Sequence, residues 1–230
     1  MRIGEYLPNP FGRAEREIYM GNALELSGLT KAYSDFTLEH IDLMLPEGCI
    51  MGLIGENGAG KSTMIKAILG AIRPDAGKIN VLGCNVSSPD FVKIKAQLGI
   101  VLDEANFPLV LTPTQVNRVM KDIYPNWQED VFFSYLKRFG LPENKRFQDF
   151  SKGMKMKLSI ATALSHQATL LILDEATSGL DPIARDEILD VFNEFTRQEN
   201  HSILISSHIT SDLEKICDHI AFLHKGRLRF

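Results

Sequence analysis

The feature that most constrains this chain is a run of small residues between a short apolar segment and a helix signal. The run is Gly55-Glu56-Asn57-Gly58-Ala59-Gly60-Lys61-Ser62-Thr63, and it fits the pattern Gly-x4-Gly-Lys-Ser/Thr at every position. Residues 49–54 before it predict a buried strand, and residues 62–69 after it predict a helix that Gly70 ends. The sequence therefore predicts a strand, a tight glycine-rich loop and a helix in succession.

This succession is suited to binding phosphate groups. Small residues allow backbone N–H groups to turn inward around phosphate oxygens, and the N-terminus of the helix adds a favourable dipole. Lys61 can reach the β- and γ-phosphates of a nucleotide, and Ser62 can place its hydroxyl on Mg²⁺. The candidate nucleotide ligands of this loop are Gly55, Asn57, Gly58, Gly60, Lys61, Ser62 and Thr63. The alternative, a glycine-rich turn with an accidental lysine, leaves the flanking strand and helix unexplained.

A second signal is an apolar run that ends in two carboxylates. Residues 170–173 are all Leu or Ile, which is typical of a strand buried on both faces of a parallel sheet, and Asp174 and Glu175 follow them. Asp174 would hold Mg²⁺ from the end of this strand, directly or through water. Glu175 would polarise an attacking water molecule. With the phosphate loop, these residues are the minimal equipment of a nucleoside triphosphatase.

Asp103 and Glu104 also follow a predicted strand, residues 98–102. Carboxylates at the carboxyl end of a strand face the ligand side of an open α/β sheet, so Asp103 is a further candidate metal ligand. A solvated acidic turn explains these two residues equally well.

The rest of the pattern predicts an α/β protein with a mainly parallel core sheet. Strands are expected at residues 24–26, 36–45, 78–82, 169–174, 202–206 and 220–223, and helices at 183–195 and 209–216. Residues 106–165 read as a helical insertion between strands. Its first helix should begin at Thr112-Pro113-Thr114-Gln115, which makes Gln115 a helix cap rather than a catalytic glutamine. Further helical pieces are expected at 127–139 and 142–147.

Composition limits the function classes. A net charge of −4 argues against a broad basic face for nucleic acid, so no nucleic-acid partner is expected. Three scattered cysteines without metal-like spacing predict reduced thiols in a cytosolic protein. No apolar stretch approaches the ~20 residues that span a bilayer. Residues 1–21 lack periodicity and are expected to lie outside the fold, either as translated upstream sequence before a start at Met20 or as a genuine N-terminal arm.

The segment Phe150-Ser151-Lys152-Gly153-Met154-Lys155-Met156-Lys157-Leu158 resembles the signature motif of ATP-binding cassette (ABC) proteins, usually Leu-Ser-Gly-Gly-Gln. The other motifs of this family follow in register. Ser178-Gly179-Leu180-Asp181 resembles the D-loop, His208 the switch histidine, and Tyr33 the aromatic residue that stacks on adenine. The resemblance covers residues 22–230.

The resemblance implies a P-loop ATPase with an N-terminal antiparallel β subdomain, a parallel core sheet and the helical insertion. Two copies, or one copy and a related subunit, would meet head to tail. Each ATP with its Mg²⁺ would then lie between residues 55–63 of one chain and Ser151, Gly153 and Asp181 of the other. Glu175, His208 and Lys61 would carry the catalytic roles.

A transmembrane permease is the implied partner, at the cytoplasmic face of the membrane, and the Ser-Lys-Gly-Met form of the signature favours an exporter. A non-transport cassette ATPase that acts on ribosomes or nucleic acid is the alternative. A kinase with the same loop is disfavoured by the signature and His208.

This chain departs from the family pattern at two places. Asp103 stands where the family commonly has a glutamine, and a carboxylate cannot donate an amide hydrogen bond. Lys152 and Met154 replace Gly and Gln in the signature, and a solvated Lys152 side chain that points away from the site is expected. The aromatic residues of the insertion either form its own small core or meet the permease; they are Phe107, Tyr124, Trp127 and Phe139.

Overall fold

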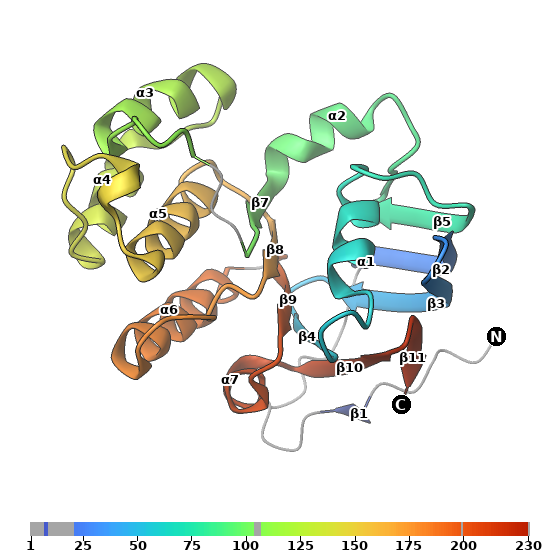
Figure 1. Cartoon of the computed structure of the whole chain (residues 1–230). Helices are drawn as coiled ribbons and strands as arrows, with labels where there is room; N and C mark the ends of the chain where they lie inside the picture. The colour runs from blue at the N-terminus through green and yellow to red at the C-terminus, as the bar shows by residue number, and fades with distance from the viewer. Residues whose placement is uncertain (1–6, 9–20, 104–106, 199, 230) are drawn as a thin grey trace.

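Two sheets of different strand direction organise the chain (Figure 1). The computed structural model describes residues 7–8, 21–103, 107–198 and 200–229. In spatial order, the core sheet contains β1 (Leu7–Pro8), β10 (His219–His224), β4 (Ile50–Ile54), β9 (Ser202–Ser207), β8 (Leu170–Asp174) and β7 (Leu98–Val101), and β11 (Arg227–Arg229) also pairs with β10. The five strands from β10 to β7 are parallel. The antiparallel sheet contains β3 (Thr37–Pro46), β2 (Asn22–Ala32), β5 (Ala76–Val81) and β6 (Cys84–Asn85).

The parallel strands are buried on both faces because a separate core lies on each side of the sheet. Successive side chains of a strand point to opposite faces. In β8, Leu171 and Leu173 enter one core, whereas Leu170 and Ile172 enter the other. The first core includes residues of α5 (Lys152–Leu164), α6 (Pro182–Phe195) and α7 (Thr210–Ile216). The second includes α1 (Lys61–Ile68) and the antiparallel sheet, which explains the continuous apolar run in the sequence.

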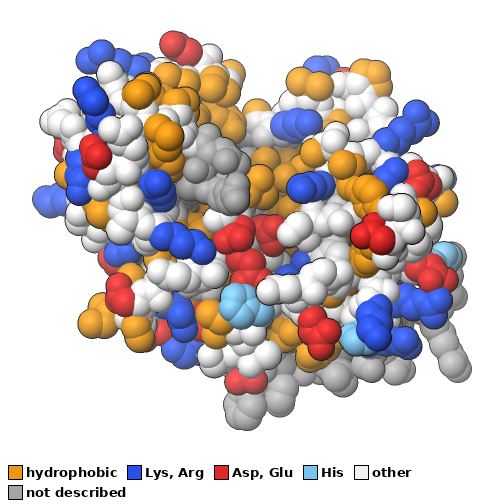
Figure 2. All heavy atoms as spheres, in the orientation of Figure 1, with side chains coloured by type: hydrophobic (Ala, Val, Ile, Leu, Met, Phe, Trp, Pro, Cys, Tyr) orange, Lys and Arg blue, Asp and Glu red, His pale blue; other side chains and the backbone are white. Residues whose placement is uncertain are grey.

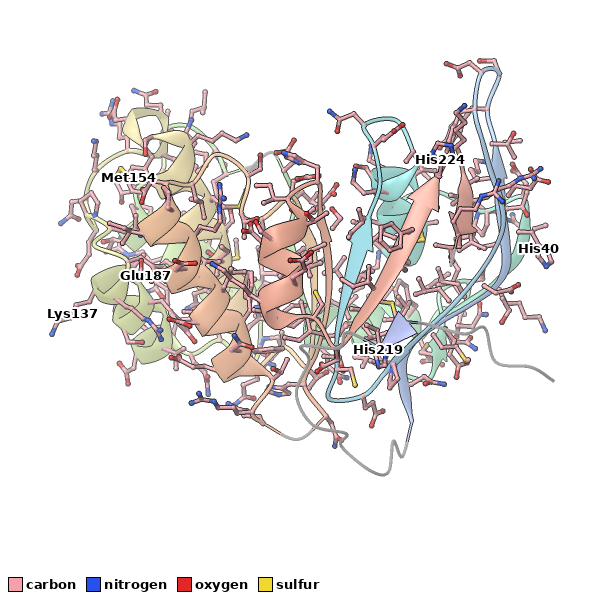
Figure 3. All side chains as sticks on the ribbon, turned by 90° about the horizontal axis from the view of Figure 1, so that it is seen from below. His40, Lys137, Met154, Glu187, His219 and His224 are labelled. Carbon is pink, nitrogen blue, oxygen red and sulfur yellow. The ribbon has the colours of Figure 1, made fainter. Side chains whose placement is uncertain are left out.

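The helical insertion lies beside the core sheet, on the side away from the antiparallel sheet (Figure 1). It begins with α3 (Pro113–Ile123) and α4 (Glu129–Arg138), and a short helix, α2 (Phe91–Ile94), precedes β7. Viewed from below, Met154 and Glu187 lie among the helices, and His40 and His224 lie on the strand side (Figure 3). The predicted fold class is confirmed: an antiparallel N-terminal sheet, a mainly parallel core and a helical insert. The boundary at 106–165 remains a prediction.

The start of α3 has the predicted capping box. The Thr112 hydroxyl accepts a hydrogen bond from the Gln115 N–H at 3.4 Å, and the Gln115 side chain accepts one from the Thr112 N–H at 2.9 Å. These reciprocal bonds satisfy backbone donors that the first helical turn would leave unpaired. The assignment of Gln115 to a cap is therefore confirmed.

The prediction of a helix at residues 142–147 is wrong. The chain forms a turn there and then a short 3-10 helix at Phe147–Asp149. The Phe147 N–H donates to the Leu111 carbonyl at 2.8 Å, and the Gln148 N–H donates to the Leu109 carbonyl at 2.9 Å. Since the backbone pairs with the segment before α3, its donors are not available for an α-helix.

The structure describes only three of residues 1–21. The expectation that this segment does not belong to the fold therefore remains a prediction. Within this segment, Leu7–Pro8 forms the edge strand β1, which pairs with His219 and Ile220 of β10. In the described part of the chain, no helix has the length and apolarity needed to cross a bilayer.

We predict that Thr112→Ala lowers the free energy of unfolding by about 1 kcal/mol, because the first turn of α3 loses its side-chain acceptor. Urea denaturation measures the change. Gln115→Ala removes the other half of the box, and the double variant should cost less than the sum of the single variants. Full additivity would contradict a reciprocal cap.

Candidate functional site

The phosphate loop joins β4 to α1 through glycines in conformations that other residues avoid. Gly60 is the N-cap of α1 with φ 110°, and Gly58 has φ 81°. A Cβ atom on Gly60 would lie 2.6 Å from Cζ of Phe36, whereas a Cβ on Gly58 would meet no atom within 4 Å. The ring of Phe36 therefore packs directly on the backbone of the loop at Gly60.

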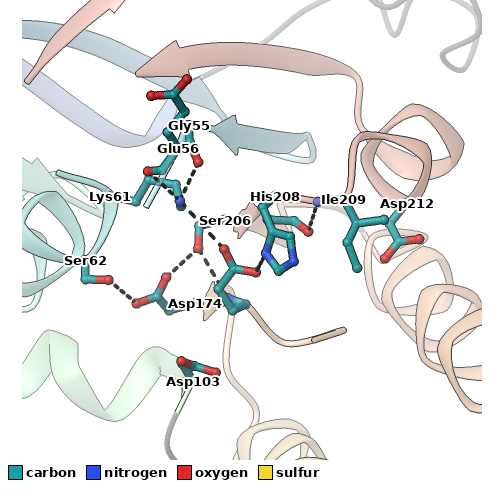
Figure 4. A network of polar contacts seen from close by, with 12 residues as sticks. Gly55, Glu56, Lys61, Ser62, Asp103, Asp174, Ser206, His208, Ile209 and Asp212 are labelled. Carbon is teal, nitrogen blue, oxygen red and sulfur yellow. Dashed lines mark hydrogen bonds and ion pairs between the residues drawn. The ribbon is translucent and has the colours of Figure 1, made fainter. Parts of the chain in front are cut away.

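Lys61 is held inside this loop. Its side chain is buried, and Nζ donates to the carbonyl oxygens of Gly55 at 2.6 Å and Glu56 at 3.3 Å (Figure 4). The same nitrogen lies 3.7 Å from Oε1 of Glu175. An ammonium group in this position presents positive charge to the cavity beside the loop, where anionic phosphate oxygens would bind.

The register of the core sheet brings Asp174 to the start of α1. Leu53 of β4, Ser206 of β9 and Asp174 of β8 occupy one row across the three parallel strands. The Ser62 hydroxyl donates to Oδ2 of Asp174 at 2.8 Å, and the Ser206 hydroxyl donates to Oδ1 (Figure 4). Asp174 is 6% exposed.

These groups fit a magnesium ion. Within the described residues, no Lys, Arg or His forms an ion pair with Asp174, and no cluster of three or more His, Cys, Asp or Glu could hold a metal alone. Mg²⁺ in nucleotide sites commonly takes one or two protein oxygens, with phosphates and waters as its other ligands. The hydroxyl of Ser62 and the carboxylate of Asp174 supply such a pair.

Glu175 adopts a left-handed backbone conformation, with φ 54°, directly after β8. Its N–H donates to the backbone oxygen of Ser206 at 3.1 Å and approaches the Ser206 hydroxyl at 3.2 Å. Its carboxylate is 13% exposed and lies 2.6 Å from Nδ1 of His208, whose side chain is 53% exposed. Backbone strain of this kind is concentrated at functional sites, and here it turns the Glu175 side chain away from Asp174 toward His208.

Ser206 is one of the site residues that the sequence analysis does not identify. It bonds both Asp174 and Glu175 from the strand that lies between β4 and β8. The available signal was a hydroxyl residue at the end of a buried strand, two residues before His208. Its partners are distant in the sequence, so only the strand order identifies them.

The loop and the carboxylates line one cavity of about 520 Å³. Its lining residues are Asp35, Phe36, Glu56, Asn57, Gly58, Gly60, Lys61, Ser62, Thr63, Asp103, Asp174 and Glu175. Figure 2 shows acidic side chains gathered near the middle of this face, with a histidine beside them. Asp103 thus lies on the same cavity as Asp174, as its position at a strand end predicts; Glu104 lies outside the described residues.

Tyr33 does not line this cavity. Its side chain is 47% exposed, with Nζ of Lys31 at 5.7 Å from the ring centroid. The aromatic residue that reaches the cavity is Phe36, which follows Tyr33 in the same turn and accepts the Tyr33 N–H at its carbonyl oxygen, at 2.7 Å.

The signature segment and the D-loop segment pack against each other, and neither contributes a residue to the cavity lining. Ser151 caps α5 by accepting the N–H of Met154 at 3.2 Å. A Cβ on Gly153 would lie 3.4 Å from the Leu180 side chain. Asp181 caps α6, and the N–H groups of Ala184 and Ile183 hold the pKa of its carboxyl below the usual value.

The sequence predicts a solvated Lys152 side chain that points away from the site. The structure keeps it more than half exposed but turns it toward Asp103, a residue of the cavity lining. Nζ lies 3.7 Å from Oδ1 of Asp103, and its methylene groups pack on Gly179. Both charged side chains are more than half exposed, so the pair contributes little to stability. It nevertheless joins the two places at which the chain departs from the family pattern.

The aromatic residues of the insertion pack mainly on one another and on its core. Phe139 is buried, Trp127 donates to Asn117 at 2.8 Å, and Tyr124 stacks on His166 at 4.1 Å. Burial of the imidazole lowers the pKa of His166. Phe107 and Tyr124 line a separate groove of about 180 Å³. The exposed apolar residues nearby are Leu109, Val110, Val119 and Ile123.

Comparison with known proteins identifies the family. The ABC transporter family model matches residues 38–178. The bacitracin transport ATP-binding protein BcrA of Bacillus licheniformis is 35% identical over 91% of this chain and 69% of its own length. The lantibiotic transport ATP-binding protein SrtF of Streptococcus pyogenes is 34% identical over 89% of this chain and 88% of its own.

A solved ATP-binding subunit of an ABC transporter superposes with a TM-score of 0.83 at 31% identity, over 90% of this chain and 88% of that one. The phosphate loop, the buried Asp174 and the Glu175–His208 pair are thus set in the fold of this family. The chain belongs to the ABC transporter family, as an ATP-binding subunit that hydrolyses ATP for transport.

Proposed function

We propose that this chain binds ATP with Mg²⁺ in the cavity at the phosphate loop and powers an exporter as a peripheral subunit at the cytoplasmic face of the membrane. The observation that carries this proposal is the contact of the Ser62 hydroxyl with Asp174 on one side of Lys61 and of Glu175 with His208 on the other. Export is supported by the relatives, whose names assign them to bacitracin and lantibiotic transport.

The metal would be held by Ser62 and Asp174, with Asp103 as a further candidate on the same cavity. Bound Mg²⁺ would neutralise charge on the β- and γ-phosphates. The Ser206 hydroxyl bonds one oxygen of Asp174 and so fixes the orientation in which the carboxylate presents the other.

Three side chains, one from the phosphate loop and two from the ends of β8 and β9, would act on the phosphates and the attacking water. Lys61 supplies a buried positive charge at the phosphate loop. Glu175 is the candidate general base, because its carboxylate faces the cavity and is oriented by His208 at 2.6 Å. His208 would face the γ-phosphate with its second ring nitrogen, Nε2. Because Nδ1 donates to the Glu175 carboxylate, Nε2 would donate to a phosphate oxygen only when the ring carries both protons.

Two copies, or this chain and a related subunit, would complete the site. Ser151, Gly153 and Asp181 are not among the residues that line the cavity, and the Ser151 and Asp181 side chains are exposed. The N-terminus of α5, which Ser151 caps, can therefore contact the phosphates of an ATP molecule bound to a second chain. Tyr33 is exposed enough to stack on an adenine at the cavity edge, next to Phe36.

A transmembrane permease is the proposed partner of the helical insertion. The groove at Phe107 and Tyr124 and the exposed Val119 and Ile123 form an apolar surface on α3 and its neighbours. An apolar groove between helices and a sheet is suited to receive an amphipathic helix.

Comparing Gly60→Ala with Gly58→Ala distinguishes two costs of an alanine in the phosphate loop: a steric clash and an unfavourable backbone conformation. Both alanines would carry a left-handed φ, at about 1 kcal/mol each, but only the one at position 60 meets the Phe36 ring. We expect Gly60→Ala to raise the Kd of a fluorescent ATP analogue about tenfold more than Gly58→Ala does. Equal affinities would argue against a cradle that depends on contact with Phe36.

Glu175→Gln keeps the shape of the side chain and removes the base. Turnover should fall at least about 100-fold, while ATP affinity stays near that of the parent. Size-exclusion mass with ATP should then report an ATP-bound dimer, and Gly60→Ala, whose ATP affinity is expected to be lower, serves as a control that should need more ATP to form one. Hydrolysis at the parental rate would remove Glu175 from its catalytic role.

Photo-crosslinking tests whether the helical insertion contacts a transmembrane permease. We expect a crosslinker at Val119 or Ile123 to capture an integral membrane protein in membranes of the native host. The matched control is Val92 on α2, which is 73% exposed and apolar but lies outside the insertion. Capture of ribosomal proteins or nucleic acid would favour the non-transport alternative and leave the ATPase assignment intact.

A further inference from the structure

A buried ion pair joins α6 to α7 behind the site. Nε of Arg185 lies 3.5 Å from Oδ2 of Asp212, whose side chain is 2% exposed. We infer that Arg185 and Asp212 are positioning residues for hydrolysis: they fix the turn that carries His208 relative to the D-loop segment. This inference rests on the proposed role of His208.

Arg185 also reaches the D-loop segment. Its Nη2 donates to the carbonyl oxygen of Leu180 at 3.3 Å, while Nε faces Asp212. The contact with Asp212 is an ion pair without a hydrogen bond, so the guanidinium donates to the Leu180 carbonyl while its charge faces Asp212. A lysine would keep the charge but lose this planar fork. Leu180 in turn packs against Gly153 of the signature segment. One side chain therefore ties the signature and D-loop contact to the first turn of α7.

From Asp212 the connection to His208 is short. Asp212 lies in the first turn of α7, and its N–H donates to the Ile209 carbonyl at 3.3 Å. The Ile209 N–H donates to the Ser207 hydroxyl at 3.0 Å, so His208 lies between two hydrogen-bonded residues (Figure 4). A shift of α7 would move the His208 ring away from its 2.6 Å contact with Glu175.

Burial makes this pair sensitive to loss of either member. A carboxylate as enclosed as Asp212 requires a compensating charge, and Arg185 is the cation that faces it. A second ion pair, Lys215 with Asp186 at 2.7 Å, joins the same two helices, but both of its side chains are more than half exposed. The two helices lie side by side in Figures 1 and 3. The exposed pair is a matched control, since it links α6 and α7 without touching the D-loop segment.

The experiment measures kcat, the KM for ATP and Tm for Arg185→Lys, Arg185→Ala, Asp212→Asn and the double variant Arg185→Ala/Asp212→Asn, with Lys215→Ala as the control. We expect each single change of the buried pair to lower kcat about tenfold with KM within about twofold, because the phosphate loop is untouched. The double variant should lose no more than the worse single variant. Lys215→Ala should retain kcat within about twofold.

Arg185→Lys decides the matter if Arg185→Ala does not fold. It keeps a positive charge opposite Asp212 but loses the fork that reaches Leu180, so kcat should fall while Tm stays near that of the parent. A kcat like that of Lys215→Ala, or losses of the two single variants that simply add, would overturn the inference. Glu175→Gln is measured in parallel. If Glu175→Gln keeps full turnover while the Arg185 and Asp212 variants lose it, the proposed catalytic role of Glu175 fails and the positioning role of Arg185 and Asp212 stands.

Discussion

The hydrogen bond from the Ser62 hydroxyl to Asp174 is the contact on which the site depends, because it joins the helix after the phosphate loop to the end of a strand that is not its neighbour in the sheet. Strand β9 lies between β4 and β8, and its residue Ser206 is paired with Leu53 on one side and Asp174 on the other. The Ser206 hydroxyl donates a hydrogen bond to Asp174. A buried carboxylate is tolerable only with such partners. The register of the sheet thereby fixes the position of the Asp174 carboxylate beside the phosphate loop.

Local strain orients the reactive groups around this fixed point. Gly60 allows the loop to turn into α1 with the Phe36 ring against its backbone. Glu175 accepts a left-handed conformation directly after Asp174, and two hydrogen-bond contacts of its N–H with Ser206 stabilise that turn. As a result, neighbouring carboxylates serve different partners: Asp174 faces Ser62, and Glu175 faces His208.

The signature and D-loop segments are connected to this centre through a few side chains. The signature and D-loop segments touch at Gly153 and Leu180, and Arg185 connects Leu180 with Asp212 on the helix that follows His208. The exposed Lys152–Asp103 pair makes a weaker connection from the signature to the cavity. Buried links fix geometry, whereas exposed ones respond to solvent and partners.

The sequence by itself determined the elements whose signal is local. The phosphate loop, the apolar run before Asp174 and the capping box at Thr112 each depend on residues a few positions apart, and their structures follow directly from backbone chemistry. The expected helix at residues 142–147 was wrong because its backbone donors bond the segment before α3, which no local pattern reveals.

Only the tertiary structure decided which distant residues meet. Ser206 and Phe36 reach the site, Tyr33 lies outside the cavity lining, and Arg185 faces Asp212. These contacts follow from strand order and helix packing. They depend on how the whole core packs. Because the hydrophobic effect that drives this packing is non-directional, no local sequence pattern indicates which polar residues it will bring together.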